Sequence, residues 1–234
     1  VLAGMVGSRN GWVEAPYVAC PASPGDIAAA GITVDLAADT RATILPGLSC
    51  DDGAFDVMRG EETLIVGLGL DDGLACLPGT HSKWVEIRGG RITRFASFMT
   101  GEIWGLLRSQ SILARLAEEP VADDAGRGAE RGRAAARGPA GLLNAAFAAR
   151  TEVLAGRMRP GEVGPFLSSL LVAQEIAGAE ALFGRAHRVH LVADGALAES
   201  YGAALAAAGL ETTIATPEAA FVAGVRRLAS GLSR

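Results

Sequence analysis

The residues best suited to chemistry lie in LPGTHSKW, at 77–84, between two stretches that alternate like strands. A Pro-Gly-Thr turn lets the backbone approach a ligand closely and directs several N–H groups to one point, which suits phosphate oxygens. The residues that would surround such a phosphate are Gly79, Thr80, His81, Ser82 and Lys83. The alternative is an ordinary tight hairpin turn, in which His81 is only a structural histidine.

A second candidate is MRGEET, at 58–63, where two carboxylates precede the apolar residues of an expected helix. Glu61 or Glu62, placed beside a sugar hydroxyl, could act as a general base. Both could instead only complement the positive end of the helix dipole. We assign Arg59, in the same segment, to substrate binding.

The opening segment GMVGSRNGWVEAPY, at 4–17, offers hydrogen bonds, a cation for a carboxylate and an aromatic wall. These are the elements of a pocket for a polyol acid. The residues predicted to bind substrate here are Ser8, Arg9, Asn10 and Trp12. The same segment is equally compatible with a structural turn against which Trp12 packs.

A fourth candidate is LVADGALAESYGAAL, at 191–205, where Asp194 and Gly195 stand between an apolar strand and a helix. An adenosine could pack against such a strand-to-helix turn. One glycine at that position is weak support by itself.

The elements that must position these residues follow from periodicity and turn chemistry. We expect a strand at 1–6, a short strand at 42–46, and a β-turn-β-turn-β-α unit between about 73 and 110, with Gly89-Gly90 as a hairpin turn. Helical periodicity covers 141–184, and a strand, helix, strand, helix series ends the chain, which implies a parallel crossover. Residues 118–140 are rich in Gly, Ala and Arg, and are expected to be a mobile surface connection with at most a weak helix.

Composition narrows the class of protein. The chain has 234 residues, half of them apolar, and a net charge of -5, which argues against binding to nucleic acid. Its three cysteines have no metal-ligand spacing, so a reducing compartment fits best. No apolar run is expected to span a bilayer, and no signal peptide is visible, so we expect a cytoplasmic protein without a membrane partner.

The candidate segments occur in an order that closely resembles the 2-dehydro-3-deoxygalactonokinase family. The matching segments are GMVGSRNGW, MRGEET, LPGTHSKWV, GGRITRFASFMTGE, FLSSLLVAQEI and LVADGALAESY. The resemblance covers nearly the whole chain and is weakest at 118–140. LPGTHSKW and MRGEET are highly specific in combination, and they favour the phosphate site over the plain turn.

The resemblance implies an α/β, two-lobed, ribonuclease H-like fold of the sugar kinase, actin and Hsp70-ATPase type. It implies a remainder of a substrate-binding lobe at 1–69, a nucleotide-binding lobe at 70–216 and a closing helix at 217–234. It also implies ATP and Mg²⁺, with the metal held through the ATP phosphates, and phosphorylation of the terminal hydroxyl of 2-dehydro-3-deoxy-D-galactonate. A homodimer is compatible with these features.

One departure from the family pattern is the first phosphate loop, an Asp-Trp-Gly-Thr-like turn that nothing in this sequence matches. We therefore expect an incomplete first lobe, upstream residues that are missing, and weak or no kinase activity from this chain alone. A missing Asp could share or hold the role of base. Other classes stay open: a phosphohydrolase of the same fold, or a sensor that binds a sugar acid or nucleotide without turnover.

Overall fold

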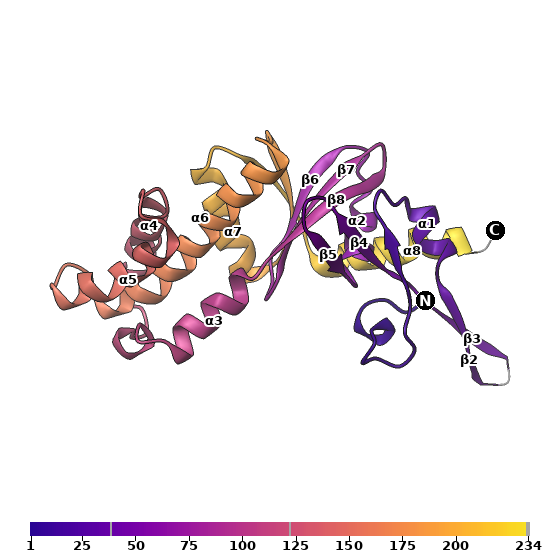
Figure 1. Cartoon of the computed structure of the whole chain (residues 1–234), viewed down its shortest axis with the longest axis horizontal. Coiled ribbons are helices and arrows are strands. Elements are labelled where there is room, and N and C mark those ends of the chain that lie inside the picture. The colour runs from indigo at the N-terminus through magenta and orange to yellow at the C-terminus, as the bar shows by residue number, and fades with distance from the viewer. Residues whose placement is uncertain (38, 122, 233–234) are drawn as a thin grey trace.

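The computed structural model describes residues 1–37, 39–121 and 123–232, and it is a mixed α/β structure of elongated shape. A five-stranded sheet lies in the middle, with one group of helices at one end and smaller sheets with three further helices at the other (Figure 1). One apolar cluster lies on each face of the central sheet, and a third lies among the helices of the first group. The expected α/β class is confirmed.

The central sheet has the strand order β10-β9-β6-β7-β8. Its strands are β6 (Gly73–Leu77), β7 (Ser82–Arg88), β8 (Arg91–Phe98), β9 (Arg188–Val192) and β10 (Glu211–Ala215). β10, β9 and β6 are parallel, whereas β7 and β8 return antiparallel. Gly89 and Gly90 both have positive φ, 54° and 69°, so the predicted hairpin turn is confirmed.

The first sixty residues form two smaller sheets. One contains β1 (Tyr17–Ala19), β4 (Gly47–Asp51) and β5 (Phe55–Met58), and the other is the hairpin of β2 (Ile32–Ala37) and β3 (Thr40–Ile44). Asp56 on β5 accepts hydrogen bonds from the backbone N–H and the hydroxyl of Ser97 on β8, at 2.6 and 2.9 Å. This contact joins the first small sheet to the edge of the central sheet.

The strand expected at 1–6 is wrong. Leu2 forms only an isolated bridge with Ile44, and the chain then turns at Gly4, where φ is 84°, into the short 3-10 helix η1 (Met5–Gly7). Because a positive φ interrupts an extended strand, the apolar run cannot continue pairing beyond Ala3.

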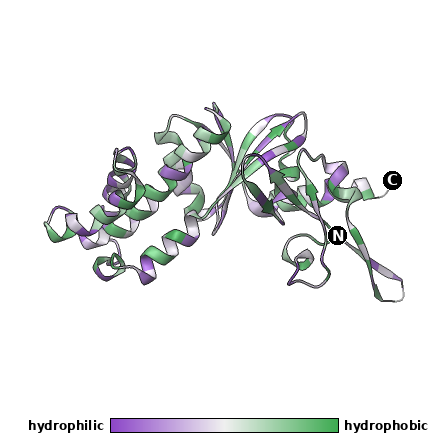
Figure 2. Cartoon of the chain, viewed as in Figure 1, coloured by the Kyte–Doolittle hydropathy of each residue, from purple (hydrophilic) through white to green (hydrophobic). Residues whose placement is uncertain are grey.

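The first group of helices contains α3 (Thr100–Gln110), α4 (Asp124–Ala136), α5 (Gly141–Leu154), α6 (Val163–Phe183) and α7 (Gly195–Ala207), with the short helices η2 (Ala114–Leu116) and η3 (Pro160–Glu162). α6 is largely hydrophobic (Figure 2). By length and composition residues 160–183 could cross a membrane, but half of that stretch is buried inside the protein. The expectation that no run reaches this length is therefore wrong.

Residues 118–140 are not a loose connection, although residue 122 lies outside the described part of the chain. α4 packs along α6, and a Cβ added at Gly128 or Gly132 would lie 2.4 or 2.2 Å from the carbonyl oxygen of Glu162 or Phe166. The glycines that indicated flexibility are the residues that let the two backbones approach. Packing of this kind cannot be recognised from the sequence, because it depends on glycines and not on apolar side chains.

The last helix returns to the first residues of the chain. α8 (Pro217–Leu232) packs against α1 (Pro24–Ala29) and α2 (Glu61–Leu68), and Figure 1 shows it beside them. A Cβ at Gly67 would lie 1.8 Å from the carbonyl oxygen of Ala220, and one at Gly224 would lie 1.9 Å from that of Thr63. The helices therefore cross in backbone contact. Residues 233–234 of the expected closing helix lie outside the described residues.

This crossing predicts a loss of stability on substitution. Gly224→Ala should lower the free energy of unfolding by about 1–3 kcal/mol, because the new methyl group overlaps a backbone atom that cannot rotate away. Gly105→Ala is the matched control: Gly105 is inside α3 with no atom within 4 Å of its added Cβ. This control should instead gain stability, by about 0.8–1 kcal/mol. Urea unfolding measures the change in the free energy of unfolding of each variant. Equal changes in Gly224→Ala and Gly105→Ala would refute the close crossing of the helices.

Candidate functional site

Three loops meet at one edge of the central sheet. Cys76 on β6 pairs with Leu191 on the parallel strand β9, so both strands end together, and the 78–81 turn emerges beside Asp194 and Gly195. The backbone N–H of Ala193 also bonds to the carbonyl of Ala215, the last residue of β10, at 3.1 Å. Carboxyl ends of parallel strands are where α/β proteins bind ligands.

The turn between β6 and β7 is held by the start of α3. The backbone N–H of Glu102 donates to the carbonyl of Thr80 at 3.0 Å, and a Cβ at Gly101 would lie 2.3 Å from the carbonyl oxygen of Gly79. The His81 ring and the Glu102 carboxylate are 2.5 Å apart, and both side chains are partly exposed. Thr80 is exposed, and a Cβ added at Gly79 would meet no atom within 4 Å. The turn is fixed while one side of it stays accessible.

Ser82 and Lys83 point to opposite faces of β7. Ser82 is fully buried, and its hydroxyl lies 3.0 Å from that of Tyr201 on α7, away from the turn. Lys83 instead reaches toward α2, where its Nζ lies 3.9 Å from Oε1 of Glu61. The structure thus brings Lys83 and Glu61 together but turns the Ser82 hydroxyl away from them.

The start of α2 holds its two carboxylates differently. Glu61 Oε2 accepts a hydrogen bond from the backbone N–H of Arg59 at 3.0 Å, and its side chain is 30% exposed. Glu62 is 0% exposed, and its oxygens accept from the N–H of Gly60 at 2.6 Å and from the Thr63 hydroxyl at 3.1 Å. Gly60 has φ 112°, a conformation that only glycine adopts readily. Of the two candidates, Glu61 is the accessible carboxylate.

Burial raises the pKa of Glu62 to about 7, and the neighbouring Glu61 adds to the rise, although the hydrogen bonds oppose it. A raised carboxyl pKa means that the folded protein keeps a proton which the unfolded chain releases. The stabilising contribution is complete below the ordinary value of 4.5 and is lost as the pH rises toward 7.

A pH-dependent effect of Glu62→Gln follows. Between pH 5 and pH 8 the free energy of unfolding of the variant should rise relative to the parent by up to about 3 kcal/mol, because glutamine needs no proton. Urea midpoints at the two pH values measure this difference. A variant whose advantage does not change with pH would show that Glu62 titrates normally.

The opening segment divides into a buried and an exposed part. The guanidinium of Arg59 donates from Nη2 to the carbonyl of Ala15 at 2.8 Å and lies 4.2 Å from the centre of the Tyr17 ring. Its Nε and Nη1 atoms are buried without a hydrogen-bond partner, as is the hydroxyl of Ser8. The other predicted residues, Arg9, Asn10 and Trp12, are exposed on the surface of the same loop.

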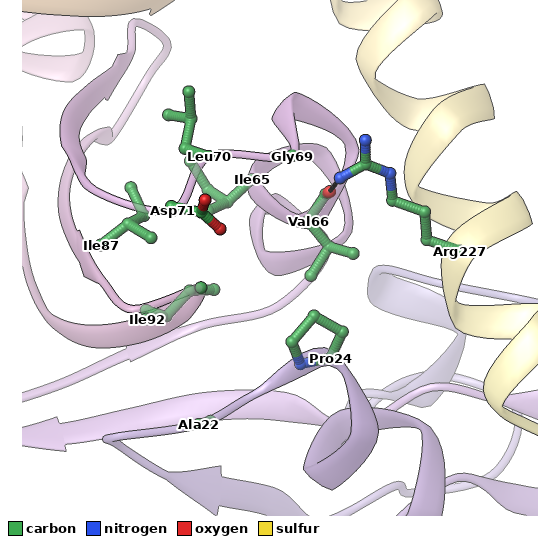
Figure 3. A pocket seen from close by; sticks show the side chains of 11 residues that line it. Ala22, Pro24, Ile65, Val66, Gly69, Leu70, Asp71, Ile87, Ile92 and Arg227 are labelled. Carbon is green, nitrogen blue, oxygen red and sulfur yellow. Dashed lines mark hydrogen bonds between the residues drawn. The ribbon is translucent and has the colours of Figure 1, made fainter.

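Two pockets lie apart from all these residues. One of 160 Å³ lies between α1, α2 and the β7–β8 hairpin, where Arg227 reaches the carbonyl of Val66 (Figure 3). The other, of 270 Å³, lies at the opposite ends of β6 and β9 from the turn, beside Arg88 and Arg188. Within the described residues, no group of three or more His, Cys, Asp or Glu side chains could hold a metal ion.

Comparison with known proteins identifies the family. The family model for 2-keto-3-deoxy-galactonokinase matches residues 1–228. The chain belongs to this family. A Rhizobium meliloti protein named as a probable 2-dehydro-3-deoxygalactonokinase is 36% identical over 99% of this chain and 78% of its own length. The 2-dehydro-3-deoxygalactonokinase of Escherichia coli is 35% identical over 100% of this chain and 79% of its own length.

A solved structure agrees. The crystal structure of a Sinorhizobium meliloti protein, described as a putative 2-dehydro-3-deoxygalactonokinase, superposes with a TM-score of 0.88 at 34% identity, over 98% of this chain and 78% of that one. Members of the 2-keto-3-deoxy-galactonokinase family are sugar-acid kinases, which are phosphotransferases. The resemblance noted in the motifs is therefore confirmed.

Sequence reasoning missed a buried polar group behind the turn. Trp84, Glu175 and Tyr201 form it with Ser82, and none of the three was a candidate. The available signal was Glu175, one of two charged residues in the 21-residue apolar helix α6. A carboxylate buried within such a helix requires hydrogen-bond partners.

Proposed function

We propose that this protein transfers the γ-phosphoryl group of ATP to the terminal hydroxyl of 2-dehydro-3-deoxy-D-galactonate, which gives the 6-phosphate. Family membership supports the phosphotransfer and the use of ATP. The observation that carries the residue assignment is the meeting of Lys83 and Glu61, 3.9 Å apart, beside the carboxyl edge of three parallel strands. A cation for phosphate oxygens and a carboxylate for a hydroxyl are there within reach of one another.

On the nucleotide side, the Gly79–Lys83 turn would contact the β- and γ-phosphates through backbone N–H groups, Thr80 and the Lys83 amine. Asp194 and Gly195 would face the adenosine, since β9 ends beside that turn. Ser82 would contribute through its backbone alone. Mg²⁺ would be held through the phosphate oxygens of the nucleotide and would neutralise part of their charge.

On the sugar-acid side, Arg59 and Ser8 are the residues with unmet hydrogen-bonding capacity. A buried N–H or O–H without a partner costs free energy, and a substrate carboxylate would supply acceptors for both. Arg9, Asn10 and Trp12 would cover the bound molecule from the exposed part of the loop. Glu61 would orient the attacking hydroxyl, while the buried Glu62 would support the start of α2 through its contacts with Gly60 and Thr63.

The finer architecture belongs to the same proposal. We place the chain in the two-lobed sugar kinase, actin and Hsp70-ATPase class, with 1–69 as substrate lobe, 70–216 as nucleotide lobe and 217–234 as closing helix. The packing of α8 on α1 and α2 supports the role of that helix. A cytoplasmic location fits substrates of this class.

The test is a coupled ADP-release assay with Mg-ATP and 2-dehydro-3-deoxygalactonate. It is run on this chain and on a form that carries further upstream residues. We expect turnover that requires the sugar acid in at least one of the two forms. Release of ADP without sugar acid would indicate a phosphohydrolase, and binding of both ligands without turnover in either form would indicate a sensor.

A further inference from the structure

Three of the family-like segments each contribute to one buried polar group. Ser82 and Trp84 lie on β7, Glu175 on α6 and Tyr201 on α7, and their exposed fractions are 0, 1, 3 and 3%. Trp84 Nε1 donates to Glu175 Oε1 at 2.8 Å, and the Tyr201 hydroxyl donates to Glu175 Oε2 at 2.7 Å. The Ser82 hydroxyl completes the chain at 3.0 Å from that of Tyr201.

The direction of these hydrogen bonds follows from the number of hydrogens. A tyrosine hydroxyl has one hydrogen, and Tyr201 donates it to Glu175. Ser82 must therefore donate to Tyr201. Burial and the negative charge of Glu175 raise the pKa of Tyr201, which keeps this hydroxyl protonated. The donated hydrogens of Ser82, Tyr201 and Trp84 are thus all directed along these hydrogen bonds toward the Glu175 carboxylate.

The position of this group ties together two edges of the proposed nucleotide site. Ser82 is the first residue of β7 and follows the turn proposed to contact phosphates. Tyr201 lies in α7, the helix that begins at Gly195 after Asp194. Glu175 links both to α6, so the turn and the start of α7 cannot move apart without breaking a buried hydrogen bond.

We propose that Glu175 and Tyr201 are positioning residues that set the distance between the 78–83 turn and the start of α7, and so set the affinity for the nucleotide. This inference rests on the proposed function. Small displacements of binding groups have large effects on phosphoryl transfer, which depends mostly on orientation and charge. A purely structural role would instead lower stability and leave nucleotide affinity unchanged.

The first variant is Tyr201→Phe, which removes one oxygen atom and separates Ser82 from Glu175. We expect the dissociation constant for ADP and the KM for ATP to rise between about tenfold and about hundredfold, while the KM for the sugar acid stays constant. Titration of the protein with ADP alone measures the dissociation constant for ADP without any turnover. Glu175→Ala should act in the same direction.

Glu175→Gln is the rescue variant. Its carbonyl can still accept from Trp84, and its amide can donate to the Tyr201 oxygen, which then donates to Ser82. All three hydrogen bonds are kept, and only the two that involve Tyr201 reverse their direction. Nucleotide affinity should therefore stay close to that of the parent. A loss as large as that of Glu175→Ala would overturn positioning through these contacts.

Gln174→Met is the matched control on the neighbouring position of α6. Gln174 donates to the carbonyl of Ala136 at 2.6 Å, on α4 and away from β7. This variant should lose stability without losing nucleotide affinity. If Tyr201→Phe behaves in the same way, the inference is overturned while the proposed function stands. If the parent protein does not bind ADP at all, both are overturned.

Discussion

Glu61→Gln is expected to lower kcat by about two to four orders of magnitude, the range that a positioned general base contributes. Glutamine keeps the size and one acceptor oxygen, so the hydrogen bond from the N–H of Arg59 can persist. It cannot take a proton from the sugar hydroxyl. We therefore expect KM values for both substrates to change little, and steady-state kinetics with the sugar acid as varied substrate measures the split.

The control variants for Glu61→Gln are Glu62→Gln and Glu130→Gln, which make the same substitution at other positions. Glu130 is exposed on α4 and should be neutral for activity. Glu62 is fully buried and should influence stability more than turnover. If Glu61→Gln retained the parent kcat, Glu61 would be removed from the mechanism. A base from elsewhere would then be required.

Lys83→Met is expected to reduce kcat/KM by about 10²–10³-fold, the usual cost of removing one preorganised group that stabilises transition-state charge. The Lys83 side chain is 7% exposed and its amine lies beside Glu61, in a site where water screens the charge little. Methionine retains the length and apolar stem of the side chain. Circular dichroism and urea unfolding should show a folded protein, while the ADP-release assay shows the loss.

Arg88→Met controls for loss of a cation from the same strand. Arg88 is at the far end of β7, where it is exposed and pairs with Glu86. It should leave kcat/KM unchanged. An equal loss in both variants would point to a general electrostatic effect, and full activity in Lys83→Met would exclude the lysine from phosphate binding.

Much of this arrangement was predictable because it depends on local signals. The hairpin at Gly89-Gly90, the start of α2 at Glu61 and the β9-α7-β10-α8 series each follow from turn residues, capping charge or a continuous apolar run. The neighbouring positions of the turn and Asp194 also follow, once β6 and β9 are taken as adjacent parallel strands.

What could not be predicted depends on contacts between distant segments. The face of β7 that carries Ser82 is decided by which helices cover the sheet, so a hydroxyl expected at phosphate points to Tyr201 instead. The packing of α4 on α6 depends on Gly128 and Gly132, which have no side chain to separate the two helices. In the sequence, such glycines cannot be told apart from those of a flexible linker. The unmet hydrogen bonds of Arg59 and Ser8 appear only when the opening loop and the segment before α2 are placed together.

The return of α8 to α1 and α2 also bears on how the protein is made. Ala220 and Leu228 belong to the same apolar cluster as Ile27, Ile65 and Val66, yet they are translated after the whole central sheet. While the ribosome adds the intervening residues, that cluster stays uncovered and open to association with chaperones or other nascent chains. Early termination within 217–232 should therefore remove the protein from the cell by degradation, even though every residue assigned to chemistry has been synthesised.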